Sequence, residues 1–339
     1  MPKKWKALPA ADGGSLDPFA SSGLSERRLR EYTPAMRRST LALLVLLLAV
    51  AAVPCSSFAQ DWAKTRLDAS PRHREYVTLK HGDRSVQAFV VYPEVNRKTP
   101  VIILIHEIFG LSDWAKEMAD ELAAAGYIVI APDLLSGTGP GGGGTDSYSG
   151  MDAITKAVSG LDPNTVNADL DAAADYGEHL PASNGTIVTV GFCWGGGKSF
   201  AFAAHRKDLA AAFVFYGPPP SEFSTITAPV YGFYAGNDAR IGATIPATVS
   251  GMKAAGKKFE HVTYEGAGHG FMRAGEDPSN NNPANKTARD RALERLTSLL
   301  KALPGGSASL ATPVKTTSAP ELAKTAVSCH SSEDSAAIM

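Results

Sequence analysis

The chain has few cysteines and no strong excess of charge of either sign. Only Cys55, Cys193 and Cys329 occur in 339 residues, which excludes a framework of several disulfides. The formal net charge is −1 for the whole chain. Residues 60–339 hold 25 basic and 30 acidic side chains, a balance of about −5. We therefore expect no basic surface of the kind that binds nucleic acid.

The sequence also lacks an apolar run that is long enough for a comfortable membrane span. Its longest run, Leu41–Val53, follows Arg37 and Arg38 and precedes Ser57-Phe58-Ala59, which resembles a small-residue cleavage site. This order predicts a secretory signal peptide that is cleaved near Ala59. We expect residues 1–59 to be an N-terminal extension with this signal. The mature chain is then periplasmic or secreted and has no stable membrane span.

Several features of this region leave alternatives open. Residues 1–35 are polar and unpatterned, so translation could begin at Met36. The pair Arg37-Arg38 alone is weak support for a twin-arginine signal. Pro54 fits poorly before Cys55 as the lipid-bearing cysteine of a lipoprotein.

Residues 60–303 are long enough to form one domain with a large core. Strand-like apolar stretches alternate with helical patterns, which predicts a mainly parallel central sheet with helices on both faces. The expected strands are 75–80, 85–92, 101–105, 127–130, 186–190, 211–216, 229–234 and 259–264, and the expected helices begin near Ser112, Asp162, Trp194 and Ala284. Residues 304–339 are rich in Ser, Ala, Thr and Pro, so we expect a disordered tail.

The most informative motif is Gly191-Phe192-Cys193-Trp194-Gly195-Gly196, directly after the apolar stretch 186–190. A strand, a glycine-flanked nucleophile and a helix form the nucleophile elbow of the α/β-hydrolases, here with cysteine in place of serine. The alternative is a buried structural cysteine, which is common in protein cores. A lone cysteine in the core of an exported domain favours a chemical role over a disulfide.

Two candidate partners follow Cys193, each just beyond an expected strand. Asp238 comes after 230–233, and His269 comes after 261–264. The order nucleophile, acid, histidine is that of the α/β-hydrolases, and catalytic loops of open α/β sheets follow the strands. Taken singly, an aspartate in a turn is commonly a turn former. The three residues in this order predict a catalytic triad.

A further loop, His106-Glu107-Ile108-Phe109-Gly110, follows the strand 101–105. With this loop, the cysteine elbow, the aspartate and the histidine, the chain resembles the dienelactone hydrolase family over roughly residues 75–300. The resemblance implies an α/β-hydrolase fold and hydrolysis of a small-molecule ester or lactone through an acyl-cysteine, without a metal or organic cofactor. It assigns the site residues as follows: Cys193 nucleophile, His269 base, Asp238 its orienting partner, Glu107 the carboxylate that takes the thiol proton when substrate reorients it, Ile108 and Trp194 the oxyanion-hole amides, and Arg273 a binder of a substrate carboxylate.

The chain departs from the family in one respect. Dienelactone hydrolases use a second arginine from the middle of the chain, but between Arg84 and Arg206 only Arg97 occurs, before the first catalytic loop. We therefore do not expect the family's dienelactone in its usual pose. His106 replaces a residue that is often glutamine, and it could contact substrate or support the site by hydrogen bonding. For Arg273, a surface salt bridge is the alternative.

Other motif matches fail on inspection. The stretch 137–142 matches G-x-G-x-x-G, but proline and further glycines follow instead of a helix, so a mobile loop over the active site is the better interpretation. Asp133 is expected to be a fold-stabilising turn residue rather than a catalyst. Besides a monomeric ester or lactone hydrolase, two hypotheses remain open: a thioesterase or peptidase that uses the same triad, and a non-catalytic binding protein on a hydrolase scaffold.

Overall fold

The computed structural model describes residues 60–305. The predictions for the signal peptide, for a start at Met36, for Cys55 and Cys329 and for the tail beyond residue 305 lie outside these residues. Among residues 60–305, no helix combines the length and the apolar character that a bilayer crossing requires.

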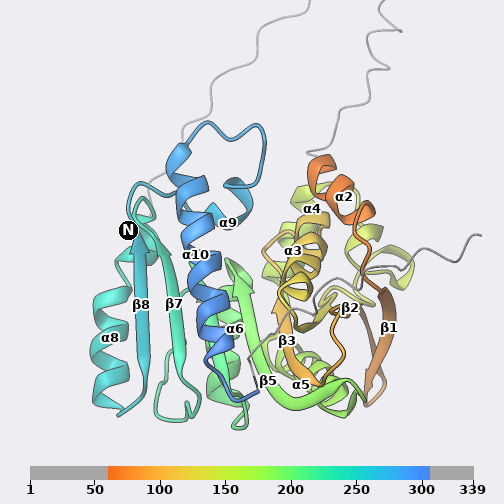
Figure 1. The fold of residues 1–339 in the computed structure, drawn as a ribbon, viewed down its shortest axis with the longest axis horizontal. Coiled ribbons are helices and arrows are strands. Elements are labelled where there is room, and N and C mark those ends of the chain that lie inside the picture. The colour runs from red at the N-terminus through yellow and green to blue at the C-terminus, as the bar shows by residue number, and fades with distance from the viewer. Residues whose placement is uncertain (1–59, 306–339) are drawn as a thin grey trace, which may run out of the picture. The chain divides into compact units, whose positions relative to one another are not determined.

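The described chain is built on one eight-stranded sheet (Figure 1). Its strands are β1 (Arg74–His81), β2 (Arg84–Val91), β3 (Thr99–Ile105), β4 (Ile128–Pro132), β5 (Ser183–Phe192), β6 (Ala211–Phe215), β7 (Val230–Ala235) and β8 (Phe259–Tyr264). The spatial order is β1-β2-β4-β3-β5-β6-β7-β8. Only the pairs β1–β2 and β2–β4 are antiparallel. The predicted mainly parallel sheet is therefore confirmed.

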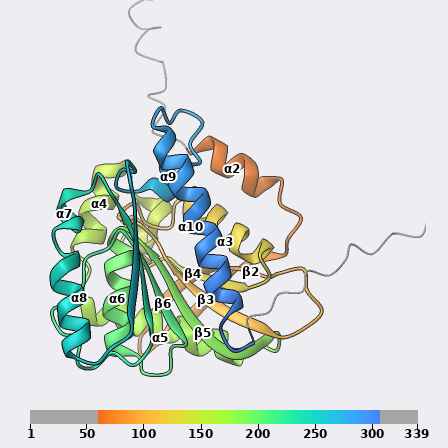
Figure 2. The same cartoon turned by 60° about the vertical axis from the view of Figure 1, so that its left-hand side comes forward.

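Helices cover both faces of this sheet (Figure 2). They are α2 (Asp61–Asp68), α3 (Asp113–Ala124), α4 (Met151–Ser159), α5 (Pro163–His179), α6 (Trp194–His205), α7 (Ala239–Gly242), α8 (Ile245–Ala254), α9 (Phe271–Ala274) and α10 (Pro283–Lys301). One apolar cluster joins α2, α3 and α10 to one face, and a second joins α5, α6 and α8 to the other.

Strand β3 shows how the sequence produces this layering. Successive side chains of a strand point to opposite faces. Ile102 and Leu104 accordingly belong to the cluster with α3 and α10, whereas Val101 and Ile103 belong to the cluster with α5 and α6. Because both faces are covered, β3 reads as a continuous apolar run rather than an alternating one.

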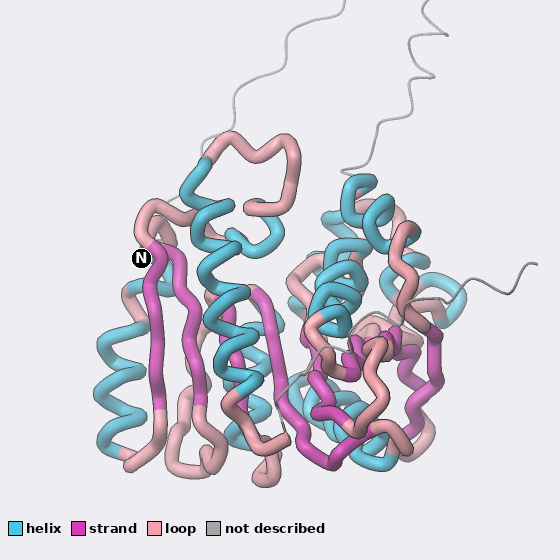
Figure 3. The backbone as a smooth tube through the Cα atoms, in the orientation of Figure 1, coloured by secondary structure: helices cyan, strands magenta, loops and turns pink. Residues whose placement is uncertain are grey.

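Two helix starts are fixed by the side chains that the sequence suggested. The Ser112 hydroxyl accepts a hydrogen bond from the Ala115 amide at the start of α3, at 3.3 Å. The Asp162 carboxylate accepts from the Thr165 amide at the start of α5, at 2.8 Å, and Pro163 occupies the first turn. Helices α2, α4 and α8 were not predicted. Figure 3 shows a long loop between α9 and α10, which becomes important below.

Candidate active site

The loops that follow β3, β5, β7 and β8 carry the candidate site residues. In a parallel sheet the carboxyl ends of neighbouring strands lie at the same edge, where α/β proteins place their sites. Glu107 follows β3, Cys193 follows β5, Asp238 follows β7 and His269 follows β8. Residues that are up to 162 positions apart in the chain thus meet at one edge.

Cys193 lies at a sharp turn between β5 and α6. Its backbone has φ 54° and ψ −116°, a region that residues other than glycine rarely adopt. The turn is held by a hydrogen bond from the Cys193 amide to the Phe215 carbonyl, at 3.0 Å. A Cβ at Gly195 would overlap the carbonyl oxygens of Ile105 and His106, so the start of α6 reaches the end of β3 only because Gly195 has no side chain. The predicted elbow geometry is present.

The side chains of Cys193, His269 and Asp238 form a continuous hydrogen-bonded series. His269 Nδ1 lies 2.5 Å from Asp238 Oδ2, and because the carboxylate can only accept, Nδ1 carries the proton. His269 Nε2 is then free to accept from the Cys193 thiol, whose sulfur is 3.1 Å away. Asp238 also accepts from the Ile241 amide at 3.2 Å, which fixes its carboxylate at the start of α7.

The surroundings of Cys193 favour the neutral thiol over the thiolate. Burial raises the pKa of the Cys193 thiol, and the negative charge of Glu107 raises it further. Hydrogen bonding from the amides of Trp194 and Ile108, together with the charge of Arg240, opposes this shift. These two amides are the ones that the sequence analysis assigned to the oxyanion hole.

Glu107 and Arg273 form an ion pair behind the thiol. Arg273 Nε donates to Glu107 Oε2 at 2.7 Å, and the Glu107 side chain is 3% exposed. The Arg273 guanidinium also lies over the ring of Phe109, 4.9 Å from its centroid. Arg273 therefore forms a salt bridge, as the alternative expected, but its partner is the buried Glu107 rather than a surface carboxylate.

His106 is fully buried beneath this site. Its Nδ1 donates to the Glu107 carbonyl at 2.7 Å, and its ring stacks on Trp194 with centroids 5.6 Å apart. Burial lowers the pKa of His106, which favours the neutral ring. These contacts accord with the alternative in which His106 supports the loop by hydrogen bonding, and they leave it no exposed surface for a substrate.

Tyr216 was not identified from the sequence, although it also follows a strand, β6. It has a positive φ of 39°, and its ring meets His269 edge-on with centroids 5.1 Å apart. Its buried hydroxyl has no hydrogen-bond partner among the described residues. Burial and the charge of Glu107 hold the pKa of Tyr216 well above its usual value. Its place at the end of a parallel strand is the signal that could have found it.

The glycine-rich loop 136–150 is tied to the loop that carries Glu107. The Asp133 carboxylate accepts from both the amide and the hydroxyl of Thr145, each at 2.7 Å. The Thr145 hydroxyl in turn accepts from the Leu111 amide at 3.0 Å. Asp133 therefore stabilises the fold at this turn, as the sequence predicted, and it also holds the glycine-rich loop through Thr145.

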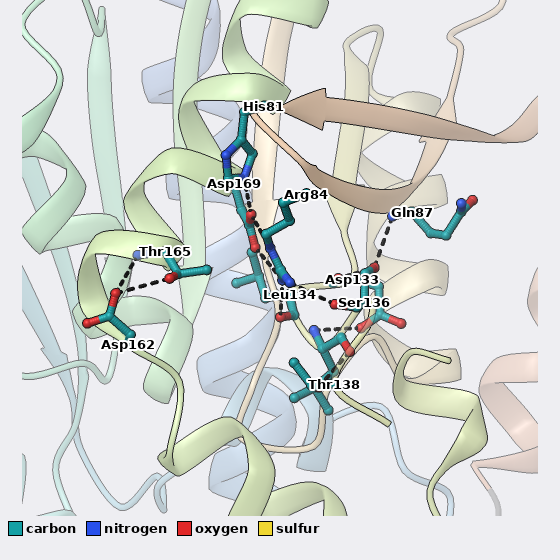
Figure 4. A network of polar contacts seen from close by, with 11 residues as sticks. His81, Arg84, Gln87, Asp133, Leu134, Ser136, Thr138, Asp162, Thr165 and Asp169 are labelled. Atoms are coloured by element: carbon teal, nitrogen blue, oxygen red, sulfur yellow. Dashed lines mark hydrogen bonds and ion pairs between the residues drawn. The ribbon is translucent and has the colours of Figure 1, made fainter. Parts of the chain in front are cut away.

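A second network holds the beginning of the same loop (Figure 4). Arg84 donates through Nη1 to the Ser136 carbonyl at 2.9 Å and through Nη2 to the Leu134 carbonyl at 3.2 Å. The guanidinium is fixed by two hydrogen bonds to Asp169, at 2.7 and 2.8 Å, and His81 also contacts this carboxylate. The hairpin β1–β2 and helix α5 thereby brace the loop.

The sequence is similar to that of known proteins over most of the described residues. The profile of the dienelactone hydrolase family matches residues 86–303. A protein of Methylorubrum extorquens named "Putative carboxymethylenebutenolidase" is 30% identical over 260 residues, covering 72% of this chain and 87% of its own. The "Carboxymethylenebutenolidase" of Pseudomonas putida is 26% identical over 204 residues, covering 59% of this chain and 86% of its own.

A solved structure gives the same result for the fold. The crystal structure of a "Putative Dienelactone Hydrolase" from Klebsiella pneumoniae is 27% identical and has a TM-score of 0.57, covering 66% of this chain and 97% of its own. The predicted α/β-hydrolase fold is confirmed. Because the family profile matches more than half of the residues of this chain, the chain belongs to the dienelactone hydrolase family.

Proposed function

We propose that the protein is an exported cysteine hydrolase that cleaves an ester or lactone through an acyl-cysteine intermediate. Its family membership makes it a dienelactone hydrolase-like hydrolase of ester or lactone bonds. The observation that carries the finer proposal is the series Cys193–His269–Asp238, at 3.1 and 2.5 Å, behind a nucleophile held at φ 54°. In acyl-transfer chemistry of this kind, the histidine, here His269, carries the proton to and from the reacting groups. The aspartate, here Asp238, holds the histidine ring in the right orientation.

The first half-reaction forms the acyl-enzyme. The Cys193 thiol must lose its proton to become the nucleophile. His269 Nε2 is in position to accept it, and Glu107 becomes a second acceptor if a substrate anion draws Arg273 away. The thiolate attacks the substrate carbonyl, whose oxygen becomes an oxyanion that accepts from the Ile108 and Trp194 amides. When the intermediate collapses, the alkoxide leaves with the proton that His269 donates.

The second half-reaction regenerates the enzyme. His269 Nε2 accepts a proton from a water molecule, whose oxygen attacks the carbonyl of the acyl-cysteine. The same two amides stabilise the second oxyanion. Its collapse releases the carboxylic acid and leaves the sulfur as a thiolate, which takes back the proton from His269. Besides the substrate and one water molecule, the proposed steps need only these side chains and amides.

The direct test is turnover of p-nitrophenyl acetate by the full chain and by Cys193→Ala and His269→Ala variants. Each variant should retain the thermal transition of the wild type and lose roughly 10³-fold or more in turnover. Intact-mass analysis should show an acetyl adduct on the wild type that Cys193→Ala does not form. Turnover at the wild-type level in either variant would exclude the triad, and an inactive wild type would favour a binding protein. A matched thioester substrate tests the thioesterase alternative.

The proposal of export is based on the order of the basic pair Arg37-Arg38, the apolar run Leu41–Val53 and the small residues Ser57 to Ala59. N-terminal sequencing of the protein from its native host should begin at or near Gln60. A cytoplasmic product that retains residues 36–59 would contradict it. This result bears on the location alone, since the catalytic proposal is tested separately.

A further inference from the structure

A pocket of about 530 Å³ lies beside Arg273 and Phe109, outside the hydrogen-bonded triad. This volume falls within the range of small-molecule sites. Phe109 is the residue after Ile108, and Arg273 binds Glu107. The pocket therefore adjoins the loops after β3 and β8 that surround Cys193. When the carbonyl carbon of an ester lies at the Cys193 thiol, a substituent of that ester can occupy this pocket.

The apolar lining of this pocket comes from three separate parts of the chain. Trp62 belongs to α2, Met151 begins α4, and Pro278 lies in the loop between α9 and α10. Phe109 from the loop after β3 completes the apolar wall. Two of these side chains are aromatic rings, whose faces attract other rings and cations.

Both rings are held in place by arginines. The Arg66 guanidinium lies 5.1 Å from the centroid of the Trp62 ring, as Arg273 lies over Phe109. Arg66 is itself fixed by an ion pair with the buried Glu276, at 2.8 Å. The ring of Trp62 thus has a defined orientation before a ligand arrives. A preorganised wall loses little conformational entropy on binding.

Helix α2 is also attached firmly to the rest of the domain. Gln60 Oε1 accepts from the Trp114 amide at 2.7 Å, and the buried side chains of Ala63 and Leu67 join the core. The family profile begins at residue 86, so α2 lies outside the region that it matches. The Trp62 wall is consequently a feature of this chain that family membership does not supply.

We infer that this pocket binds a planar aromatic ring of the substrate, and that Trp62 determines selectivity for it. This inference rests on the proposed ester hydrolysis and names the substrate class of that site. An aromatic ring fits better than a flexible alkyl chain, because two aromatic side chains and Arg273 are among the residues that line the pocket. The lining also includes Asp277 and Ser279, which accommodates a polar substituent on the ring.

The test compares two ethyl esters with the same number of non-hydrogen atoms, ethyl octanoate and ethyl phenylacetate, in a pH-indicator assay. In the full chain, Trp62→Ala should lower kcat/KM for ethyl phenylacetate about tenfold, which corresponds to about 1.4 kcal/mol. The same substitution should leave kcat/KM for ethyl octanoate within about twofold. Trp62→Phe should restore most of the loss. Lys64→Ala is the matched control on the same helix, since Lys64 is exposed, pairs with the exposed Asp68 and is not among the residues that line the pocket. Benzyl acetate, assayed in parallel, shows whether the ring belongs to the alcohol side.

A binding measurement separates this inference from the proposed reaction. The phenylacetate anion, which is the acid product of the ester, should bind to the Cys193→Ala variant in a calorimetric titration. The double variant Cys193→Ala/Trp62→Ala should bind it about tenfold more weakly, whereas Cys193→Ala/Lys64→Ala should bind it as well as Cys193→Ala does. If the wild type hydrolyses none of the esters, the reaction is refuted, while this titration still decides the pocket. Met151→Ala, which changes the part of the lining that α4 supplies, repeats the test if Trp62→Ala does not fold. Equal losses on all esters, or phenylacetate binding that neither wall variant changes, would overturn the inference.

Discussion

Replacing Glu107 by glutamine should make Cys193 more reactive towards an alkylating agent and, at the same time, less active towards esters. In the structure the carboxylate of Glu107 is the second cause, after burial, that raises the pKa of the thiol. The substitution removes this charge and leaves Arg273, its partner at 2.7 Å, without a counter-ion near the sulfur. Both changes favour the thiolate, so the pKa of Cys193 should fall.

The size of the effect follows from the charge and the chemistry of the thiol. A fall of about one pKa unit corresponds to about 1.4 kcal/mol and to about ten times more thiolate at a pH well below the pKa. A thiolate of lower pKa is also a weaker nucleophile, with a Brønsted coefficient of about 0.4–0.5. The net gain in the rate of alkylation by iodoacetamide at pH 7 should therefore be about threefold. Ester turnover should fall because the variant lacks the carboxylate proposed to accept the thiol proton.

The assay measures alkylation rates between pH 5 and 10, by loss of free thiol, and ester turnover in the same preparations. Glu121→Gln is the control, because this carboxylate lies away from the thiol, where it binds Arg289. Circular dichroism confirms that each variant is folded. An unchanged or higher thiol pKa in Glu107→Gln would refute the electrostatic argument. Faster alkylation together with undiminished ester turnover would show that Glu107 takes no part in proton transfer.

Three further predictions follow from contacts around the site. Arg273→Ala should raise KM for acidic esters more than KM for neutral esters. The difference should correspond to roughly 1.5–3 kcal/mol, the scale of a hydrogen bond to a charged group. Steady-state kinetics on a matched ester pair measures it, and equal effects on both esters would make Arg273 purely structural. Burial, Glu276 and Glu121 raise the pKa of Glu117 to about 9, so the folded chain holds a proton that the unfolded chain releases, and stability should fall as pH rises from about 4.5 to about 9. Glu117→Gln should flatten this dependence and be more stable than wild type at pH 8, by about 1–2 kcal/mol in urea unfolding; a variant that is less stable at pH 8 would contradict the shift. Thr145→Val removes the hydroxyl that links Asp133 to the Leu111 amide, and it should lower kcat with little change in KM. Thr145→Ser keeps a hydroxyl and should have the wild-type kcat. A low kcat in the serine variant as well would refute the hydrogen-bonding role.

Much of the fold was predictable because local and global signals agree. The strands around the site are short apolar runs that end in glycine or polar residues, and the capping residues Ser112 and Asp162 begin the helices as their side chains suggest. Helix α2 was missed because it is short and buries only Ala63 and Leu67, which is too little for a periodic pattern. Helix α4 was missed because it follows a long glycine-rich stretch that favours a loop.

The site was predictable to the extent that it depends on chain order. A glycine-bounded cysteine after a strand, then an aspartate and a histidine after later strands, places three side chains at one sheet edge without further information. The pairing of Glu107 with Arg273 was not derivable in this way, since the two residues are 166 positions apart and either could have pointed elsewhere. Tyr216 was overlooked because a buried tyrosine at a strand end reads as core.

The polar cluster beneath α2 shows a different limit of sequence reasoning. Glu117 and Glu121 are acidic residues that flank the apolar stripe of α3, and on a lone helix water would solvate their carboxylates. They are buried because α2 and α10 cover that side, and Arg66 and Arg289 arrive from those helices to pair with them. Burial of a charge by a distant segment leaves no local pattern, so only the tertiary structure reveals it.

The Glu107–Arg273 pair links the resting state of the thiol to the presence of substrate. While Arg273 donates to Glu107, the carboxylate is held away from proton transfer, and its charge together with burial keeps Cys193 neutral. A neutral thiol is a poor nucleophile and is also slow to oxidise, which suits a lone cysteine in the oxidising compartment that we propose. An anionic group that draws Arg273 away removes the cation that keeps Glu107 ionised, so that Glu107 can accept the thiol proton. Its own negative charge, which opposes the thiolate, is then neutralised. The arrangement therefore predicts that reactivity rises when an acidic ligand binds, and phenylacetate should accelerate alkylation of Cys193 in the wild type but not in Arg273→Ala.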